Sequence, residues 1–300
     1  MGEWIVSLAG TDDGRRLALI LAIVAAVLHA AVSAMQKGRF GPWKTRAAID
    51  ICYGVMAAPF ALLVVPWPEP HLWSILAIAW VVHATYKLLQ GSAFSIGALT
   101  VVYPVVRGIG PLVTVLAAGF VFGETFTAIQ WAGVLTLTSG IFGLAAFNMY
   151  RNRYQRGKLI QALLLAVLTG VAVAGYTTID AYGVRATENP FTFLAWLFFI
   201  DGLISVPALV AARNGLPRRR TVLRLLPHGC IGGIIAVISF GSIMLATRLD
   251  QVGQAAVLRE TSTVFAAIIG WLILKETLGP LRAVLIALIA AGAVIVEMGG

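Results

Sequence analysis

The sequence predicts an all-α integral membrane protein with ten transmembrane helices, built as two inverted five-helix repeats. The first observation is composition, because 59% of the 300 residues are hydrophobic and only 12% are charged, unlike a soluble domain. The second is that apolar windows of about 20 residues, the length that crosses a hydrocarbon core, recur along the whole chain. The third is that one stretch of the first half returns in the second half.

The ten predicted helices follow one another with short connections. They cover residues 17–37, 47–66, 72–94, 99–122, 127–149, 159–183, 190–212, 225–247, 252–274 and 279–298. The first helix follows Arg15-Arg16 and has the outline of a secretory signal. Its apolar run is long for a signal peptide and nine further segments follow, so we expect this helix to be retained.

The repeated stretch, residues 97–127, returns 152 residues later as residues 249–279. Four positions are identical in the two copies: Val105 and Val257, Arg107 and Arg259, Glu124 and Glu276, and Thr125 and Thr277. Because a unit of five helices ends on the opposite side of the membrane from its start, the second copy must be inverted. We therefore predict one membrane domain made of two repeats, residues 1–153 and 154–300.

Basic residues concentrate in the loops after the odd-numbered predicted helices. These loops carry Lys37, Arg39, Lys44 and Arg46, then Arg151, Arg153, Arg156 and Lys158, then Arg213, Arg218, Arg219, Arg220 and Arg224. The opposite face offers Arg15, Arg16, Arg185 and Arg248. Since lysine and arginine favour short cytoplasmic loops, we predict a protein of the cell (inner) membrane with both termini outside. This distribution also accounts for the net charge of +9 without a nucleic-acid partner.

The end of each copy carries a family resemblance. Phe122-Gly123-Glu124-Thr125, followed by an apolar helix with Gly133 and Gly140, resembles the end of the repeat in ten-helix EamA-type transporters of the drug/metabolite transporter superfamily. Lys275-Glu276-Thr277 and a helix with Gly292 are similar, although Lys275 replaces a glycine. The resemblance spans nearly the whole chain, and its general form is closest to bacterial amino-acid exporters. It implies a secondary transporter of small metabolites, often an exporter, that works by alternating access.

The two Glu-Thr pairs are most simply structural. Each lies where one apolar segment stops and the next begins. We expect the carboxylates of Glu124 and Glu276 to favour the positive N-terminal end of the following helix, and the threonines, Thr125 and Thr277, to cap it.

The third predicted helix carries the densest set of polar residues inside a membrane span. Trp80, His83, Lys87 and Gln90 recur at three- and four-residue spacing, and Tyr86 adjoins them, so they share one helix face. An ionisable group near the bilayer centre costs about 2.5 to 3.5 kcal/mol on insertion scales and usually faces a cavity or a partner. This face therefore either lines a substrate site or forms a structural hydrogen-bonding stripe.

The repeated arginines lie deep in apolar segments. Tyr103 and Arg107 are four residues apart and precede Gly108–Pro111, whose glycines and proline can kink a helix. In the second copy Glu260 follows Arg259, and because neighbours are about 100° apart on a helix, we expect each to have a partner elsewhere. The arginines either fix the packing of the two halves or contact substrate. Glu260 stands where the first copy has a glycine, and this asymmetry favours a functional role.

Three carboxylates inside predicted spans are candidates for carrying a coupling proton: Asp180, Asp201 and Glu260. Burial favours the neutral form of a carboxyl group, which proton coupling requires. Tyr176 shares a helix face with Asp180, and we expect it near the substrate. The same acids could instead neutralise the buried bases of the third, fourth and ninth helices, so both interpretations stay open.

The predicted substrate site consists of Trp80, His83, Tyr86, Lys87, Tyr103, Arg107, Tyr176, Arg259 and Glu260. Bases, carboxylates and aromatic rings together suit a zwitterion, so we predict transport of amino acids or similar molecules across the lipid bilayer, with a proton as candidate coupling ion. A multidrug or cation efflux carrier and an exchanger of anionic metabolites or phosphate esters stay open. We expect no catalytic centre, metal or cofactor, because Gly-x-Ser-x-Gly, His-Glu-x-x-His and metal-spaced histidines are missing. Cys52 and Cys230 are expected to be small core residues.

Overall fold

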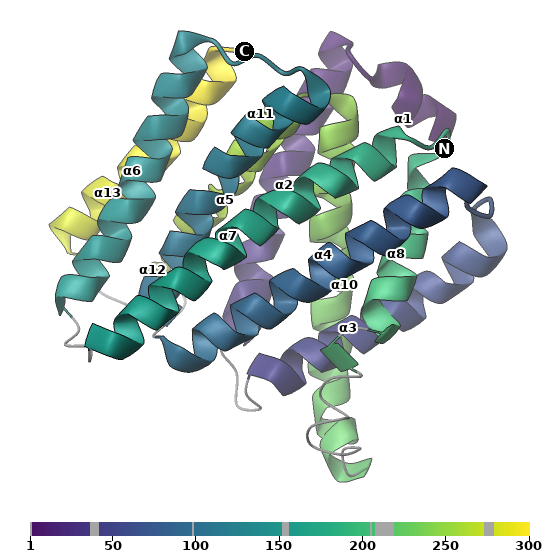
Figure 1. The fold of residues 1–300 in the computed structure, drawn as a ribbon, viewed down its shortest axis with the longest axis horizontal. Helices are drawn as coiled ribbons and strands as arrows, with labels where there is room; N and C mark the ends of the chain where they lie inside the picture. Colours follow the sequence, from purple (N-terminus) through teal and green to yellow (C-terminus); the bar gives the residue numbers. More distant parts are fainter. Residues whose placement is uncertain are drawn as a thin grey trace. The chain divides into compact units, whose positions relative to one another are not determined.

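The computed structural model describes residues 2–36, 42–97, 99–151, 156–204, 206–207, 219–272 and 279–300, and every regular element among them is a helix (Figure 1). Within these residues, eight helices are long and apolar enough to cross a membrane. The chain is therefore an all-helical, multi-pass membrane protein, as predicted. The count of ten crossing helices stays a prediction.

The chain forms two compact units. Unit 1 contains Met1–Lys87 and Ile179–Asp250, and unit 2 contains Leu88–Thr178 and Gln251–Gly300. Each unit takes segments from both halves of the sequence, and two helices, α4 (Pro70–Ile96) and α7 (Arg156–Arg185), pass from one unit to the other. The units cut across the predicted repeats, residues 1–153 and 154–300, whose inverted duplication stays a prediction.

Unit 1 is built on pairs of helices from distant parts of the chain. Besides the first part of α4 and the end of α7, it contains α1 (Gly2–Leu8), α2 (Asp12–Gln36), α3 (Pro42–Pro59), a π-helical segment at Phe60–Val64, α8 (Pro190–Ile204) and α10 (Arg219–Leu249). Helix α10 packs against α2 and α3, and α3 also packs against α8. These contacts bring the second and third helices of the chain against helices more than 100 residues later.

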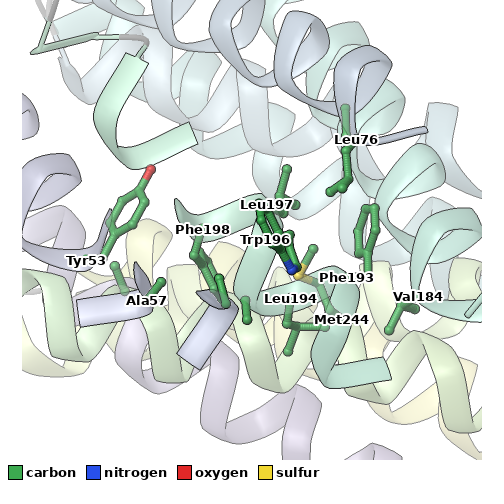
Figure 2. Close-up of a cluster of buried hydrophobic side chains, with 14 of the residues drawn as sticks. Tyr53, Ala57, Leu76, Val184, Phe193, Leu194, Trp196, Leu197, Phe198 and Met244 are labelled. Carbon is green, nitrogen blue, oxygen red and sulfur yellow. The ribbon is translucent and has the colours of Figure 1, made fainter. Parts of the chain in front are cut away.

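Aromatic side chains of α8 lie in the apolar core of unit 1, together with side chains of α3, α4, α7 and α10 (Figure 2). Trp196 is 4% exposed, and its ring centroid lies 4.9 Å from that of Trp67 and 5.0 Å from that of Trp73. Tyr53 of α3 lies at one edge of this cluster, with its ring 5.7 Å from the ring of Phe198. The apolar core thus fixes the ring of a tyrosine whose hydroxyl is available for polar contacts.

Unit 2 has the same construction from different elements. It contains α5 (Leu99–Phe122), α6 (Ala128–Arg151), most of α7, α11 (Val252–Arg259), α12 (Ser262–Leu272) and α13 (Pro280–Met298). Helix α6 lies side by side with α13, and α5 packs against α6 and α11 (Figure 1).

Segments that the repeat predicts to be equivalent pack against each other in pairs. These pairs are α3 with α8, α5 with α11, and α6 with α13. Glycines allow close approach in two of them. A Cβ atom on Gly133 would lie 2.8 Å from the carbonyl oxygen of Gly292, and a Cβ atom on Gly202 would lie 2.6 Å from the Cα atom of Gly54. The glycines of the predicted family motif are therefore positions where α6 and α13 touch.

The ninth predicted helix is the clearest error in the predicted elements, because it is two helices. Helix α11 ends at Arg259, and α12 begins at Ser262. At the break the backbone bonds are short-range: the Glu260 amide donates to the Val257 carbonyl at 3.0 Å and the Thr261 amide to the Leu258 carbonyl at 3.1 Å. By contrast α5 continues as one helix through Gly108–Pro111, the segment whose glycines and proline can kink a helix.

Several charges assigned to loops lie in helices. Lys44 and Arg46 belong to α3, and Arg219, Arg220 and Arg224 belong to α10. Arg15 and Arg16 lie in the first turns of α2, and Arg185 and Arg248 lie in the last turns of α7 and α10. Charged first and last turns lower the local hydropathy, so apolar windows start too late and end too early. Residues Lys37, Arg39, Arg153, Arg213, Arg218, Lys275, Glu276 and Thr277 lie outside the described residues.

Candidate functional site

A cluster of polar side chains lies in unit 1, and we call it the lysine cluster. Its members are Arg46, Asp50 and Tyr53 of α3, His83 and Lys87 of α4, Asp180 of α7 and Asp201 of α8. Arg46 is half-buried and the other six are buried. Four helices therefore converge on charged groups in the interior of one unit.

Lys87 is at the centre of the lysine cluster and is 3% exposed. Its Nζ donates to Asp50 Oδ2 at 2.9 Å, to the Tyr53 hydroxyl at 3.0 Å and to Asp201 Oδ2 at 2.7 Å. The Tyr53 hydroxyl in turn donates to Asp201. Three acceptors match the three hydrogens of an ammonium group, so this buried charge is compensated.

Asp50 and Arg46 are cluster residues that the sequence reasoning missed. Arg46 Nε donates to Asp50 Oδ1 at 2.7 Å, so the two oxygens of Asp50 bridge Arg46 and Lys87. The second predicted helix began at residue 47, which left Arg46 in a loop and separated it from Asp50. An arginine and an aspartate four residues apart at the start of an apolar helix are the signal that would have found this pair.

His83 pairs with Asp180 in the same cluster. Its Nε2 lies 2.9 Å from Asp180 Oδ2 and 3.1 Å from Oδ1, and because an ionised carboxylate only accepts, Nε2 is the donor. The polar face predicted on α4 is therefore buried, with His83 and Lys87 each against an acid. Tyr86 is buried on this helix, and Trp80 is half-buried, with an indole nitrogen that has no hydrogen-bond partner among the described residues.

The lysine cluster borders a small cavity inside unit 1. Its walls are formed by Val32, Arg46, Ile49, Tyr53, His83, Asp180, Leu197, Phe198, Asp201, Ala236, Phe240 and Met244. The space that the centres of water-sized spheres can occupy is about 20 Å³. Since one water needs about 10 to 15 Å³ by this measure, the cavity has room for one or two water molecules beside charged walls.

A second polar cluster lies in unit 2, and we call it the arginine cluster. Its members are Tyr103 and Arg107 of α5, Tyr176 of α7, and Arg259, Glu260 and Ser262 around the break between α11 and α12. Arg107 is 4% exposed, and its guanidinium donates to Glu260 Oε1 at 2.9 Å and to Ser262 Oγ at 3.0 Å. It also lies 5.2 Å from the ring centroid of Tyr103, within cation–π range.

Arg259 is bound more loosely than Arg107. It is 3% exposed and donates through Nη2 to the Tyr176 hydroxyl at 2.8 Å. Its Nε lies 4.0 Å from Glu260 Oε1, and neither Nε nor Glu260 Oε2 has a hydrogen-bond partner among the described residues. The arginine cluster therefore contains two guanidinium groups and one carboxylate, which leaves an excess of positive charge.

The structure assigns the partners that the sequence left open. Neighbours Arg259 and Glu260 do not share a hydrogen bond, as we expected from their angular separation, and Glu260 instead binds Arg107. The predicted bases and acids thus combine as Lys87 with Asp201, and Arg107 with Glu260. The two arginines that the repeat predicts to be equivalent have different hydrogen-bond partners.

Glu124 positions α11, which carries Arg259 at its end. Its carboxylate accepts from the backbone amides of Val252 at 2.7 Å and Gly253 at 3.0 Å, the first residues of α11. Glu124 does bind the N-terminal end of a helix, as predicted. The helix is α11, whereas we expected α6. A carboxylate at one end and an arginine in the last turn of α11 both suit the helix dipole.

Helix α6 has its own cap two residues after the predicted one. The Thr127 hydroxyl accepts from the Gln130 amide at 3.1 Å, and the Gln130 side-chain oxygen accepts from the Thr127 amide at 2.9 Å. This reciprocal pair is a capping box. Thr125 was therefore the wrong threonine, and the Thr-x-x-Gln spacing was the signal to follow.

Comparisons with known proteins agree with this architecture. Residues 160–298 match the family model of the EamA-like transporter family. The match supports the drug/metabolite transporter superfamily that the repeat motif predicted. One crystal structure of a protein is similar over 95% of this chain and 98% of its own, with a TM-score of 0.72 and 17% identity, a likeness that shows the fold alone. No curated protein matches the sequence.

Proposed function

We propose that this protein is a secondary transporter of the cell (inner) membrane that exports amino acids or similar small zwitterions by alternating access. The observation that carries the proposal is the lysine cluster, in which buried charges from four helices border a cavity. Burying so many ionisable groups in a membrane protein is costly unless they are paired or serve a pathway. Charged groups that pair with each other in the empty protein and with the substrate in the loaded protein are both paired and part of a transport pathway.

The charge balance of the two clusters supports a zwitterionic substrate. The lysine cluster has fewer permanent cations, Arg46 and Lys87, than carboxylates, Asp50, Asp180 and Asp201, and it suits an added ammonium group. The arginine cluster has two guanidinium groups against one carboxylate, and it suits an added carboxylate. Each cluster, taken by itself, thus suits one of the two charged groups of a zwitterion.

Alternating access is supported by the small size of the cavity and by the paired packing of helices that the repeat predicts to be equivalent. A space of about 20 Å³ is too small for a metabolite, so its walls must separate for a substrate to enter. Two inverted repeats would supply this motion, because each repeat can adopt the conformation of the other. The break at Glu260 offers a point at which one helix of unit 2 can bend.

Proton coupling is part of the proposal, with Asp180, Asp201 and Glu260 as candidate carriers. Asp180 is the strongest of them, because its partner His83 can itself bind a proton near neutral pH. Asp201 is bound by Lys87 and Tyr53, and Glu260 is bound by Arg107, so neither has a histidine as its partner.

A second candidate substrate class is anionic metabolites, including phosphate esters. The observation that favours it is the excess positive charge of the arginine cluster, where Arg259 Nε has no hydrogen-bond partner among the described residues. Guanidinium groups bind carboxylates and phosphates with the same fork geometry.

The proposal is tested with purified protein in liposomes. A thermal-shift screen against amino acids, organic cations, carboxylates and sugar phosphates first selects ligands, because a ligand that binds the folded state raises its apparent stability. Counterflow of the radiolabelled ligand is then measured. Saturable exchange of an amino acid is expected. Conductance without saturation would contradict a carrier, and saturable exchange of phosphate esters alone would favour the second class.

A further inference from the structure

The chain contains two cysteines, and the fold brings them together. Cys52 lies on α3 and Cys230 on α10, 178 residues apart in sequence, with their sulfur atoms 3.6 Å apart. Both are free thiols and both belong to unit 1. The sequence offered no reason for the two to meet, since each was expected to be a separate core residue. Their contact is therefore a property of the fold that needs its own interpretation.

We propose that Cys52 and Cys230 are a redox modification site, at which hydrogen peroxide produces a disulfide that fixes α3 to α10 and stops transport. A disulfide bond is about 2.05 Å long, so the sulfurs must approach by about 1.5 Å, which side-chain rotation can supply. The modification site stands on the sulfur contact alone. The effect on transport rests on the proposed function.

The chemistry needs only peroxide and the two thiols. Cys230 is the more exposed of the pair, so its thiolate attacks peroxide first, which breaks the O–O bond and yields a sulfenic acid and one water. The Cys52 thiolate then attacks the sulfenic sulfur, which forms the S–S bond and releases a second water. The two sulfurs together lose two electrons, and peroxide gains them.

The location of the pair explains why a disulfide would stop the transport cycle. Cys52 lies between Asp50 and Tyr53, two members of the lysine cluster, and Gly229 is adjacent to Cys230. A Cβ atom on Gly229 would lie 2.8 Å from the Ala48 carbonyl oxygen and 2.9 Å from Cys52 Sγ, so α3 and α10 touch closely here. Helix α10 also supplies Ala236, Phe240 and Met244 to the cavity wall. A bond between these helices fixes two walls of the cavity.

The modification site is tested by mass spectrometry of the purified protein. After treatment with hydrogen peroxide, the wild type is expected to lose two hydrogen atoms in mass and to resist N-ethylmaleimide at both cysteines until dithiothreitol is added. Cys52→Ser and Cys230→Ser should form no internal disulfide. The matched control combines Cys230→Ser with Ile231→Cys, which moves the thiol about 100° around α10 to an exposed position.

Two results would overturn the modification site. One is full alkylation of both cysteines in the peroxide-treated wild type. The other is equally fast oxidation of the control with the displaced thiol, because this would mean that the native contact is irrelevant.

The effect on transport is measured as counterflow of a radiolabelled amino-acid mixture in liposomes. The oxidised wild type should lose most of its initial rate and recover it with dithiothreitol, whereas peroxide-treated Cys52→Ser should keep its rate. Unchanged counterflow in protein that contains the disulfide would overturn the proposal that the disulfide stops transport. Absence of counterflow in the reduced wild type would contradict both the proposed transport function and the proposed effect of the disulfide on it. The mass measurement would still decide whether the disulfide forms.

Discussion

The lysine cluster and the arginine cluster bury charge in different ways. In the lysine cluster Lys87 has three hydrogen-bond acceptors, and carboxylates outnumber the permanent cations. In the arginine cluster Arg107 has two side-chain acceptors, while Arg259 has one hydrogen-bond acceptor and a distant carboxylate. The difference teaches that residues repeated in the sequence need not repeat their role. The repeat predicts that Arg107 and Arg259 are equivalent, yet of the two only Arg107 is hydrogen-bonded to the carboxylate of Glu260.

The break in the second copy explains this difference. Glu260 stands at the position of Gly108 in the first copy, and α11 ends there while α5 continues. The backbone turn at the break places Glu260 against Arg107 and leaves Arg259 in the last turn of α11 with Tyr176. Glu260 thus follows the last residue of α11 and also supplies the carboxylate that pairs with Arg107.

The largest expected effect is on stability, from Lys87→Ala in the lysine cluster. Removing the ammonium leaves Asp50 and Asp201 buried without it, and breaking a buried ion pair costs about 3 to 5 kcal/mol. The measurement is the unfolding midpoint in detergent. Adding Asp201→Asn to Lys87→Ala removes one of the stranded charges and should recover most of the loss. A Lys87→Ala protein as stable as wild type would show that these contacts contribute little.

A second prediction separates binding from coupling through Asp180. In Asp180→Asn the acceptor for His83 remains but the titratable carboxyl is removed. We expect substrate exchange to continue while uptake driven by a pH gradient is lost. Both are measured in the same liposomes, with and without the gradient. Gradient-driven uptake at the wild-type rate would exclude Asp180 as the proton carrier.

The third prediction concerns Arg259, whose bonding is least complete. Arg259→Gln should weaken substrate binding about tenfold or more, because a hydrogen bond to a charged group contributes about 1.5 to 3 kcal/mol. The control is Arg282→Gln on α13, which should bind as wild type does. Isothermal titration with the substrate decides the question. Equal substrate affinities of the two variants would show that Arg259 does not bind the substrate.

The smallest expected effects come from the caps of unit 2. Thr127→Ala removes a capping hydroxyl from α6 and should cost about 1 kcal/mol. Glu124→Ala removes a carboxylate that binds two amides of α11 and should cost about 1.5 to 3 kcal/mol, and it should also weaken substrate binding if α11 positions Arg259. Thermal unfolding compares them. A Thr127→Ala protein less stable than Glu124→Ala would contradict the assignment of Glu124 to α11.

The sequence predicted features that depend on local pattern and failed where distant segments decide. Helical periodicity found the buried face of His83 and Lys87, and angular spacing separated Arg259 from Glu260. Asp50 was missed because Arg46 shortened the predicted helix. The break at Glu260 was missed, because no glycine or proline marks it in the sequence. The contact of Cys52 with Cys230 depends on the packing of α3 against α10, which no local pattern encodes.

The central claim is that the lysine cluster takes part in transport and does not merely hold helices together. The most direct measurement is amino-acid counterflow by the folded double variant Lys87→Ala with Asp201→Asn, in which the Lys87–Asp201 pair is removed and Asp50 keeps its ion pair with Arg46. If the cluster contacts the substrate, this variant will insert and bind lipid normally but show no saturable exchange. Exchange at the wild-type rate would show that these charges are structural and would place the substrate elsewhere.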